Sequence, residues 1–515
     1  MDSRENKTEC VPSDALFGTS AAALDTNANA ELVKQFAKSR GNRIARNAVT
    51  SMDVMAAARN PVTMRTYSDT YRVAVKAPKT VTNQRQSGRC WMFSTLNTQR
   101  VEICRLLDVD DFEFSQAYGM FYDKLEKANA TLLRVCETAD RPADDREVAW
   151  LLDGAAGDGG EFRYGANLIA KYGVVPSYAM PETACSKNSS QMNARLARLL
   201  RRDAAALRRK AATGATRKEL DALRREMLAE VHRVLCVCLG EPPATFDLTV
   251  EVGPKASVDD SLLVECAPAD RTAAHDAPAE KGREAGCADK PRRLLVDRGI
   301  TPVDFERRYV RFDGTSHVEM CSIPDDVVAQ GHVYGVRLMD TVAGGKRWRL
   351  LNTTPEVLED ACVASLRAGV PCYMACDVSQ ELGRNLEDFP GVLGLGTMEY
   401  DSLFGVDFSM SRTEMFETRE TAYTHAMTFV GVELGSDGRP TAWRVQNSWG
   451  KDACKDGYLI MGADWFRTYG EYAVVERRFV EGSGHADALA PWDAGEICEQ
   501  DPWGPMGSAF ARVRA

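Results

Sequence analysis

The residues with the clearest chemical potential lie in one short run, residues 83–94. Cys90 precedes Trp91 and opens a stretch typical of a helix. At the first turn of a helix, unpaired backbone N–H groups and the positive end of the helix dipole favour a thiolate. Gln84, six residues upstream, could place its side-chain amide beside the sulfur and donate a hydrogen bond to an oxyanion. This pattern predicts a cysteine nucleophile that performs acyl transfer.

A cysteine nucleophile needs a base, and the chain contains six histidines. His425 differs from the others because it belongs to residues 424–432, whose β-branched and apolar content predicts a strand. A second predicted strand, residues 443–446, ends at Asn447, and turn-forming residues 435–440 between the two strands predict a hairpin. The hairpin would bring Asn447 next to His425. The Asn oxygen could then accept from one ring nitrogen and leave the other facing the sulfur.

Each of these residues also has an ordinary structural interpretation. A single cysteine or histidine is more often a buried core residue, and a single asparagine or loop glutamine is usually a turn or solvated residue. The occurrence of Gln84, Cys90, His425 and Asn447 in this order favours chemistry, most strongly for Cys90. Trp449 is expected mainly to pack, and it could also shield a His–Asn hydrogen bond from water.

The combination of these residues resembles the papain superfamily of cysteine peptidases. The run Gly88-Arg89-Cys90-Trp91-Met92-Phe93 is closer to bleomycin hydrolase and bacterial aminopeptidase C than to papain, which has Gly-Ser/Ala-Cys before its Trp. The resemblance extends from about residue 30 to residue 507. Further segments that carry it are Phe114-Ser115-Gln116-Ala117-Tyr118, Asp158-Gly159-Gly160, Lys171-Tyr172-Gly173-Val174-Val175-Pro176, Cys376-Asp377-Val378, Thr424-His425-Ala426-Met427-Thr428 and Pro505-Met506-Gly507.

The resemblance implies an α+β, papain-like two-lobe fold with a helical left lobe, a β-barrel-like right lobe and a helical insertion. A chain of 515 residues also exceeds one ordinary domain. Residues 189–238 are rich in Ala, Leu and Arg with a break at Gly214, which predicts two antiparallel helices, and residues 265–292 lack periodicity and predict a flexible loop. The expected segments are a loose tail (1–28), an N-terminal segment and left lobe (29–188), a helical hairpin (189–240), a connecting region with the loop (241–299), a right lobe (300–480) and a C-terminal tail directed toward the active-site cleft (481–515).

For function, the resemblance implies a cysteine aminopeptidase that releases N-terminal residues through a thioester. The implied catalytic residues are Cys90, His425 and Asn447, with Gln84 as the oxyanion donor. Substrate-binding residues implied by the family are Asp158, Gly159, Gly160 and the terminal Ala515, whose carboxylate would pair with the substrate's α-ammonium. However, this chain continues for eight residues after Gly507. A papain-like endopeptidase and a tail-inhibited peptidase therefore remain alternatives.

The composition restricts the location and the cofactors. The N-terminus resembles no signal peptide, and no apolar run is long enough to span a membrane. The 15 cysteines are irregularly spaced, which indicates reduced thiols and a cytoplasmic protein. Cys236 and Cys238 have no second ligand pair near them in sequence, so we expect neither a metal nor a cofactor.

The expected partners are peptide substrates and other copies of the chain, since the family forms hexamers. A net charge of −10 argues against general binding of polyanions. However, residues 195–233 contain 12 Arg or Lys against 5 Asp or Glu. A solvated helical hairpin or a subunit contact is the favoured interpretation, and nucleic-acid binding through Arg201, Arg208 and Arg224 is the less favoured one. The complete Gln–Cys–His–Asn set argues against a catalytically inactive scaffold.

Overall fold

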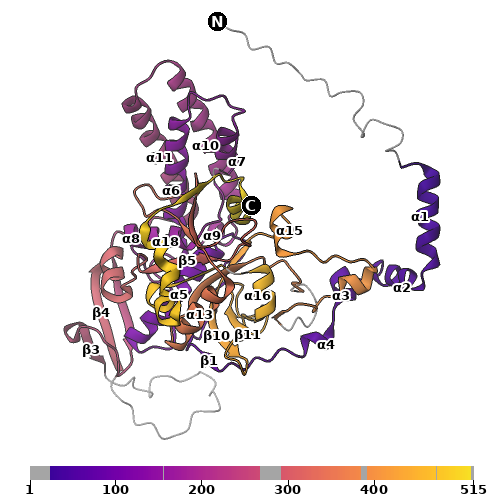
Figure 1. The fold of residues 1–515 in the computed structure, drawn as a ribbon. Helices are drawn as coiled ribbons and strands as arrows, with labels where there is room; N and C mark the ends of the chain where they lie inside the picture. Colours follow the sequence, from indigo (N-terminus) through magenta and orange to yellow (C-terminus); the bar gives the residue numbers. More distant parts are fainter. Residues whose placement is uncertain (1–23, 155, 267–291, 384–390, 471, 512–515) are drawn as a thin grey trace, which may run out of the picture. The chain divides into compact units, whose positions relative to one another are not determined.

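The structure is a computed structural model of the chain, and it describes residues 24–154, 156–266, 292–383, 391–470 and 472–511 (Figure 1). The chain forms two compact units. One combines Met1–Pro61 with Met398–Ser409, and the larger one combines Val62–Thr397 with Met410–Ala515. Residues 1–23 of the predicted tail and residues 267–291 of the predicted flexible loop lie outside the described residues.

The smaller unit consists of short helices that begin at capped positions. The side chains of Asp25, Ser39 and Asp53 each accept a backbone hydrogen bond at a helix start. The apolar side chains of the first two helices stay exposed, because neither helix buries any residue. The helices of this unit are α1 (Thr26–Lys38), α2 (Arg40–Val49), α3 (Val54–Ala58) and α14 (Tyr400–Phe404).

The helical half of the larger unit surrounds α5 (Cys90–Leu107). The predicted helix start at Cys90 is confirmed. The sequence predicted one apolar face, but the structure buries 15 of the 18 residues of α5, polar ones included, because the helix is covered on several sides. Its helical neighbours include α6 (Gln116–Glu137) and α8 (Phe162–Tyr172), and α7 (Arg146–Asp153) packs on α6.

The predicted helical hairpin is present. Two helices, α10 (Ser190–Ala212) and α11 (Arg217–Leu239), are joined at Gly214, whose φ of 81° is left-handed. Thr216 and Glu219 form a capping box at the start of α11. Both helices pack against α6 through their apolar faces and stand beside it in Figure 1.

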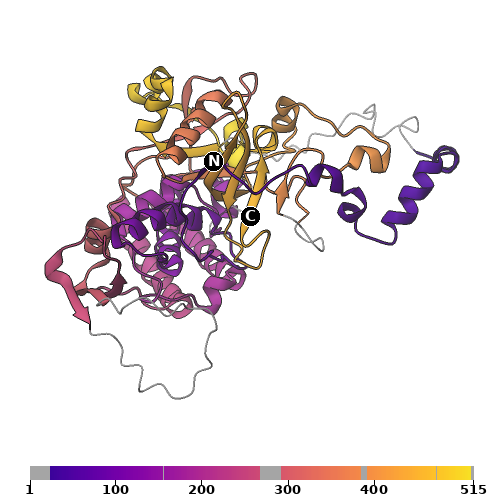
Figure 2. The ribbon, with the colours of Figure 1, turned by 90° about the horizontal axis from the view of Figure 1, so that it is seen from below.

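The other half of the larger unit is built on an eleven-stranded sheet. In Figure 2 its orange and yellow elements lie on one side of this unit and the purple and magenta helices on the other. The strands run in the order β14 (Cys498–Gln500), β6 (His332–Val336), β7 (Leu350–Asn352), β5 (His317–Cys321), β13 (Tyr472–Glu476), β8 (Cys372–Cys376), β10 (His425–Leu434), β11 (Pro440–Gln446), β12 (Tyr458–Gly462) and β9 (Val392–Leu393), with β1 (Val73–Ala74) paired to β10.

The central strands of this sheet are antiparallel, and α13 (Pro355–Arg367) packs against β10, β13 and β8. A separate sheet has the order β2 (Phe246–Val252), β4 (Arg292–Ile300) and β3 (Leu263–Cys266). The shorter helices are α4 (Pro61–Met64), α9 (Ala184–Lys187), α12 (Pro302–Phe305), α15 (Arg412–Glu417), α16 (Ala463–Tyr469), α17 (Arg477–Val480), α18 (Ala490–Ala494) and α19 (Pro505–Ala511).

The two halves of the larger unit meet where α5 packs against β10. The Ser94 hydroxyl donates to the Met427 carbonyl oxygen at 2.5 Å and lies 3.1 Å from the Thr428 hydroxyl. All three residues are buried. This contact fixes the start of α5 beside the start of β10, so that Cys90 and His425 belong to the same region.

Candidate active site

Cys90 is the first residue of α5 and is only 5% exposed. Burial raises the pKa of its thiol to about 11, although backbone hydrogen bonds from Ala426 and Trp91 act in the opposite direction. The thiolate expected at this helix start is therefore opposed by desolvation. A neighbouring base is needed to take the thiol proton, and Ala426 directly follows His425.

His425 and Asn447 are hydrogen-bonded. The predicted hairpin is confirmed, since β10 and β11 are antiparallel neighbours that pair Thr428 with Gln446. His425 Nε2 and Asn447 Oδ1 are 2.8 Å apart, and the Ser448 backbone N–H donates to the same oxygen at 2.7 Å. Because Oδ1 can only accept, Nε2 carries the proton and Nδ1 is the second ring nitrogen.

The indole of Trp449 stacks on the His425 imidazole, with ring centroids 5.0 Å apart and an interplanar angle of 27°. Asn447 is buried, at 1% exposure. An aromatic face and a buried partner keep water away from the His–Asn hydrogen bond, which strengthens it.

Gln84 lies on the segment that precedes α5, named here the nucleophile loop (residues 84–89). Its backbone N–H donates to the Ser448 carbonyl at 2.8 Å, and its side-chain oxygen accepts from the Ser448 hydroxyl at 2.6 Å. Its side-chain N–H group donates to the Ser87 carbonyl at 2.6 Å. The amide NH2 has two donors, and this bond uses one. The structure thus brings Gln84 to the chain segment that carries Asn447.

Asp158 was expected to bind substrate, but its carboxylate is occupied within the protein. It accepts hydrogen bonds from Lys124 Nζ (2.6 Å), Asn193 Nδ2 (2.7 Å), Ser189 Oγ (2.5 Å) and the Gly88 backbone N–H (2.9 Å). Asp158 is 6% exposed. The physical reason is that a buried carboxylate must be compensated by charged or hydrogen-bonding groups, and one of these groups, the Gly88 N–H, lies two residues before Cys90.

The backbone at Gly159 and Gly160 lies against the Trp91 ring. A Cβ atom at Gly160 would come within 2.5 Å of that ring, so the position requires glycine. The Trp91 Nε1–H donates to the Asp158 carbonyl at 2.9 Å, and Lys127 Nζ donates to the Gly159 carbonyl at 2.6 Å. These bonds fix the glycine pair beside the residue that follows Cys90.

The C-terminal chain approaches this region. Ala515 lies outside the described residues, which end with α19. The Tyr423 N–H donates to the Ala509 carbonyl at 2.8 Å, and the Phe510 ring is fully buried. It contacts Tyr423 and Tyr472 at centroid distances of 4.8 and 5.3 Å. The C-terminal helix is thus anchored two residues before His425.

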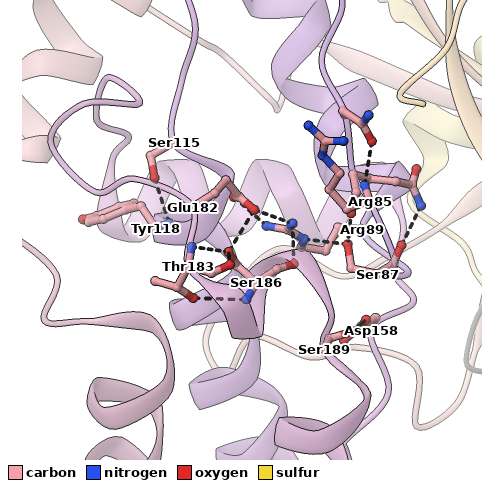
Figure 3. Close-up of polar contacts among 12 residues, drawn as sticks. Arg85, Ser87, Arg89, Ser115, Tyr118, Asp158, Glu182, Thr183, Ser186 and Ser189 are labelled. Carbon is pink, nitrogen blue, oxygen red and sulfur yellow. Dashed lines mark hydrogen bonds and ion pairs between the residues drawn. The ribbon is translucent and has the colours of Figure 1, made fainter. Parts of the chain in front are cut away.

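The sequence did not indicate two sets of largely buried charged residues near Cys90: Glu161 with Glu319 and Arg163, and Arg89 with Glu182. Burial and the neighbouring Glu319 raise the pKa of Glu161 well above its ordinary value, and Arg163 Nε donates to Glu319 at 2.8 Å. Arg89, noted in the sequence only as a family feature, is 1% exposed and pairs with Glu182 (Figure 3). A charged residue directly before a buried nucleophile signals that a partner must exist, but it does not identify Glu182.

The described part of the chain bears on two further expectations. No described helix is both long and apolar enough to cross a membrane. Among the described residues, no group of three or more His, Cys, Asp or Glu side chains is placed to hold a metal ion.

Comparison with known proteins identifies the family. The model of the Peptidase C1-like family matches residues 23–254 and 276–507. Aminopeptidase W of Lactobacillus delbrueckii subsp. lactis is 32% identical over 88% of this chain and 94% of its own length, and aminopeptidase C of the same organism is 31% identical over 90% and 94%. The crystal structure of PepW from Lactobacillus rhamnosis HN001 has a TM-score of 0.81 at 30% identity and covers 95% of this chain and 99% of its own. The resemblance and the papain-like α+β fold inferred from the sequence are confirmed: the chain belongs to the Peptidase C1-like family and is a cysteine peptidase of the bleomycin hydrolase and aminopeptidase C type.

Proposed function

We propose that this protein is a cytosolic cysteine aminopeptidase that releases N-terminal residues from peptides through a thioester acyl-enzyme. The observation that carries the proposal is the 2.8 Å hydrogen bond between His425 and Asn447. The Cys90 sulfur lies beside this pair, because it accepts a hydrogen bond from the backbone N–H of Ala426, the residue after His425. A nucleophile, a base and an orienting group in this arrangement suit acyl transfer.

In the proposed mechanism His425 takes the Cys90 proton, and the sulfur attacks the scissile carbonyl. The side-chain amide of Gln84 and the backbone N–H of Cys90 stabilise the tetrahedral oxyanion. His425 then protonates the leaving amine, so that the C–N bond breaks and a thioester remains. His425 next takes a proton from water while the water oxygen attacks the thioester carbonyl. The C–S bond then breaks, the acid product leaves, and His425 returns the proton to the Cys90 sulfur. Asn447 holds the imidazole throughout.

The choice of an aminopeptidase over an endopeptidase rests on two observations. The matched relatives are named aminopeptidases, and α19 is anchored at Tyr423, close to His425. A C-terminal segment that fills one side of the cleft would leave room only for the N-terminal residues of a peptide. Gly159 and Gly160 would then lie along the substrate with their backbone, and Ala515 would face its α-ammonium.

A cytosolic location is supported by the cysteines. All twelve cysteines whose side chains the structure describes are free thiols. Free thiols persist in a reducing compartment.

A homohexamer with active sites facing an internal chamber is the proposed assembly. The smaller unit supports self-association, because α1 leaves Leu32 and Phe36 55% and 42% exposed. Apolar side chains gathered on one element favour a protein contact. Size-exclusion chromatography with light scattering tests the assembly, and a monomeric mass would refute it.

The three arginines considered for nucleic-acid binding make contacts within the protein instead. Arg201 and Arg208 donate to the backbone carbonyls of Leu152 and Thr138, both at 3.0 Å, and Arg224 pairs with Asp221. These contacts support a structural role for the basic hairpin.

The central test compares a peptide with a free N-terminus against its N-acetylated form, using wild-type protein and Cys90→Ser. Mass spectrometry of the purified chain fixes its C-terminus in the same experiment. We expect single residues to be released only from the free peptide, and Cys90→Ser to abolish release while the circular dichroism spectrum stays unchanged. Cleavage of the blocked peptide would instead indicate an endopeptidase. Activity retained by Cys90→Ser would refute the assigned nucleophile.

A further inference from the structure

The side chain of Arg89 is sealed inside the protein directly before Cys90. All three of its guanidinium nitrogens donate hydrogen bonds: Nη1 and Nη2 donate to the two Glu182 carboxylate oxygens at 2.9 and 2.8 Å. Nη2 also donates to the Ser186 carbonyl at 2.7 Å, and Nε donates to the Ser87 hydroxyl at 2.9 Å (Figure 3). A two-pronged Arg–carboxylate pair fixes both distance and orientation.

Glu182 is itself held in place. The Ser186 hydroxyl donates to its second carboxylate oxygen at 2.9 Å, and the Thr183–Ser186 capping box orders α9 around it. A guanidinium cannot lose its charge in a protein, so Arg89 at 1% exposure depends on this carboxylate. The pair therefore connects α9 rigidly to the start of α5.

The same contacts reach Gln84. The Ser87 hydroxyl that accepts from Arg89 donates to the Gln84 carbonyl at 2.6 Å, while the Gln84 side-chain amide donates to the Ser87 carbonyl at 2.6 Å. A chain of hydrogen bonds thus runs from Glu182 through Arg89 and Ser87 to the expected oxyanion donor.

The nucleophile loop has little other internal support. It contains Arg85 in a left-handed conformation, with φ of 56°, and no side chain caps the start of α5. Beyond Arg89, its links to the segment of residues 182–189 include the Gln86 N–H, which donates to the Lys187 carbonyl at 2.9 Å, and the Asn188 side chain, which donates to the Gln86 side chain at 2.6 Å. This segment therefore supports the middle of the loop, while Asp158 holds Gly88 and Ser448 holds Gln84.

We propose that Arg89 and Glu182 are positioning residues of the peptidase site, which fix the Cys90 sulfur and the Gln84 amide relative to each other. Neither residue touches the reacting atoms. The inference rests on the proposed function for its role in turnover, and on the bonds above for its effect on Cys90. Loss of the pair should displace both groups, and a displacement of about 1 Å costs on the order of 100-fold in rate.

The chain provides a matched control on the same helix. Arg100 lies eleven residues after Arg89, about 16 Å along a helix. Its side chain is 0% exposed and its partner Asp111 33%, against 1% and 24% for Arg89 and Glu182. Arg100 also bonds a backbone carbonyl, that of Phe112, and the Thr80 hydroxyl. It therefore matches Arg89 in burial and in being paired to a carboxylate, through one bond instead of two, and it lies away from Cys90.

The experiment compares Glu182→Gln with Asp111→Asn in the full-length protein. Three quantities are measured: kcat and KM on a chromogenic aminoacyl anilide with a free amine, the rate of Cys90 alkylation by iodoacetamide at pH 7, and the midpoint of thermal unfolding. We expect both variants to lower the midpoint. Only Glu182→Gln should lower kcat, by about ten- to hundredfold with KM nearly unchanged, and change the alkylation rate. Arg89→Lys, which keeps the charge but not the two-pronged geometry, should fall between wild type and Glu182→Gln.

Equal kcat and equal alkylation rates in Glu182→Gln and Asp111→Asn would overturn the proposal. If Glu182→Gln does not fold, Arg89→Lys is compared with Asp111→Asn instead. A wild-type kcat in Arg89→Lys would then overturn the proposal. A wild-type protein that does not hydrolyse the anilide would refute the proposed function instead. The alkylation rates would still decide the positioning role, because they require no substrate turnover.

Discussion

The two sides of the candidate site are held by different kinds of structure. Cys90 and Gln84 lie on an irregular loop and a helix start, which are fixed by buried ionic groups such as Arg89–Glu182 and Lys124–Asp158. His425 and Asn447 lie at the ends of two paired strands and beneath an aromatic ring. The nucleophile side therefore depends on charge compensation, whereas the base side depends on strand register and packing. Substitutions and pH should affect the two sides in different ways.

Removing His425, the proposed base between Cys90 and Asn447, should have the largest effect on the reactivity of Cys90. Burial raises the pKa of Cys90 to about 11, so the thiol needs a base to accept its proton near pH 7. In His425→Ala we expect Cys90 alkylation by iodoacetamide at pH 7 to fall by about 10³-fold, as for the loss of a positioned general base. The rate should then rise as the pH approaches 11, because the thiolate forms above the pKa. Alkylation of the variant at the wild-type rate at pH 7 would show that the helix start alone ionises Cys90.

Breaking the ionic support of the nucleophile side comes next. Asp158→Asn leaves the buried Lys124 without its carboxylate, and we expect the free energy of unfolding to fall by about 3–5 kcal/mol. Burial pushes the Asp158 pKa upward, but Lys124, Ser189 and the Gly88 N–H outweigh it and lower that pKa below its ordinary value. The wild-type stabilisation is therefore complete above about pH 4 and lost as the pH falls toward the lowered pKa.

Urea unfolding of wild type and Asp158→Asn at pH 7 and pH 3 measures this effect. The difference between the two proteins should shrink at pH 3. Asp110, whose pKa is lowered to about 2 by the exposed Lys79 and Lys76, provides the control. Asp110→Asn should change stability far less, because exposed ion pairs are screened by water. Equal losses in both variants would contradict a special role for the buried pair.

Gln84, the proposed oxyanion donor, provides the next test of the nucleophile side. Gln84→Ala removes an amide donor, and we expect kcat to fall by about 10²–10³-fold. Ser448→Ala removes only the hydroxyl that donates to the Gln84 side-chain oxygen, and its loss should be smaller. Steady-state kinetics on the same aminoacyl anilide compare the two. A larger loss of kcat in Ser448→Ala than in Gln84→Ala would indicate that Gln84 acts by fixing the segment after β11, and not by donating to the oxyanion.

The smallest expected effect is on the base side. Trp449→Phe keeps an aromatic ring over His425, so kcat should change by no more than about threefold, whereas Trp449→Ala exposes the His–Asn hydrogen bond and should lower kcat by about tenfold. The pH dependence of kcat distinguishes shielding from simple packing, since only shielding should shift the titration of the base. Identical pH profiles in all three proteins would contradict shielding.

The sequence predicted what local patterns determine. The start of α5 at Cys90, the hairpin that joins His425 to Asn447 and the pair of helices around Gly214 each follow from residues close together in the chain. The ionic supports did not follow in this way. Asp158 lies 70 residues from Gly88, and Glu182 lies 93 residues from Arg89, so no local period or spacing connects them.

Burial depends on the whole fold and could not be predicted from the residues around Asp158 and Cys90. The family resemblance implied that Asp158 binds substrate, and the helix start favoured a thiolate at Cys90. In the structure the Asp158 carboxylate accepts hydrogen bonds from protein donors, and burial raises the pKa of the Cys90 thiol. The resemblance to a family supplied the fold class, which composition alone did not.

The bond between the Gln84 side chain and the Ser448 hydroxyl joins residues 364 positions apart. At a translation rate of about 5–20 residues per second, roughly 20–70 s separate the synthesis of these two residues. For most of that time the nascent chain carries Cys90 without His425, Asn447 or the Ser448 partner of Gln84. The order of the residues along the chain therefore implies that the proposed catalytic set cannot assemble on the ribosome until the chain has been made as far as residue 447.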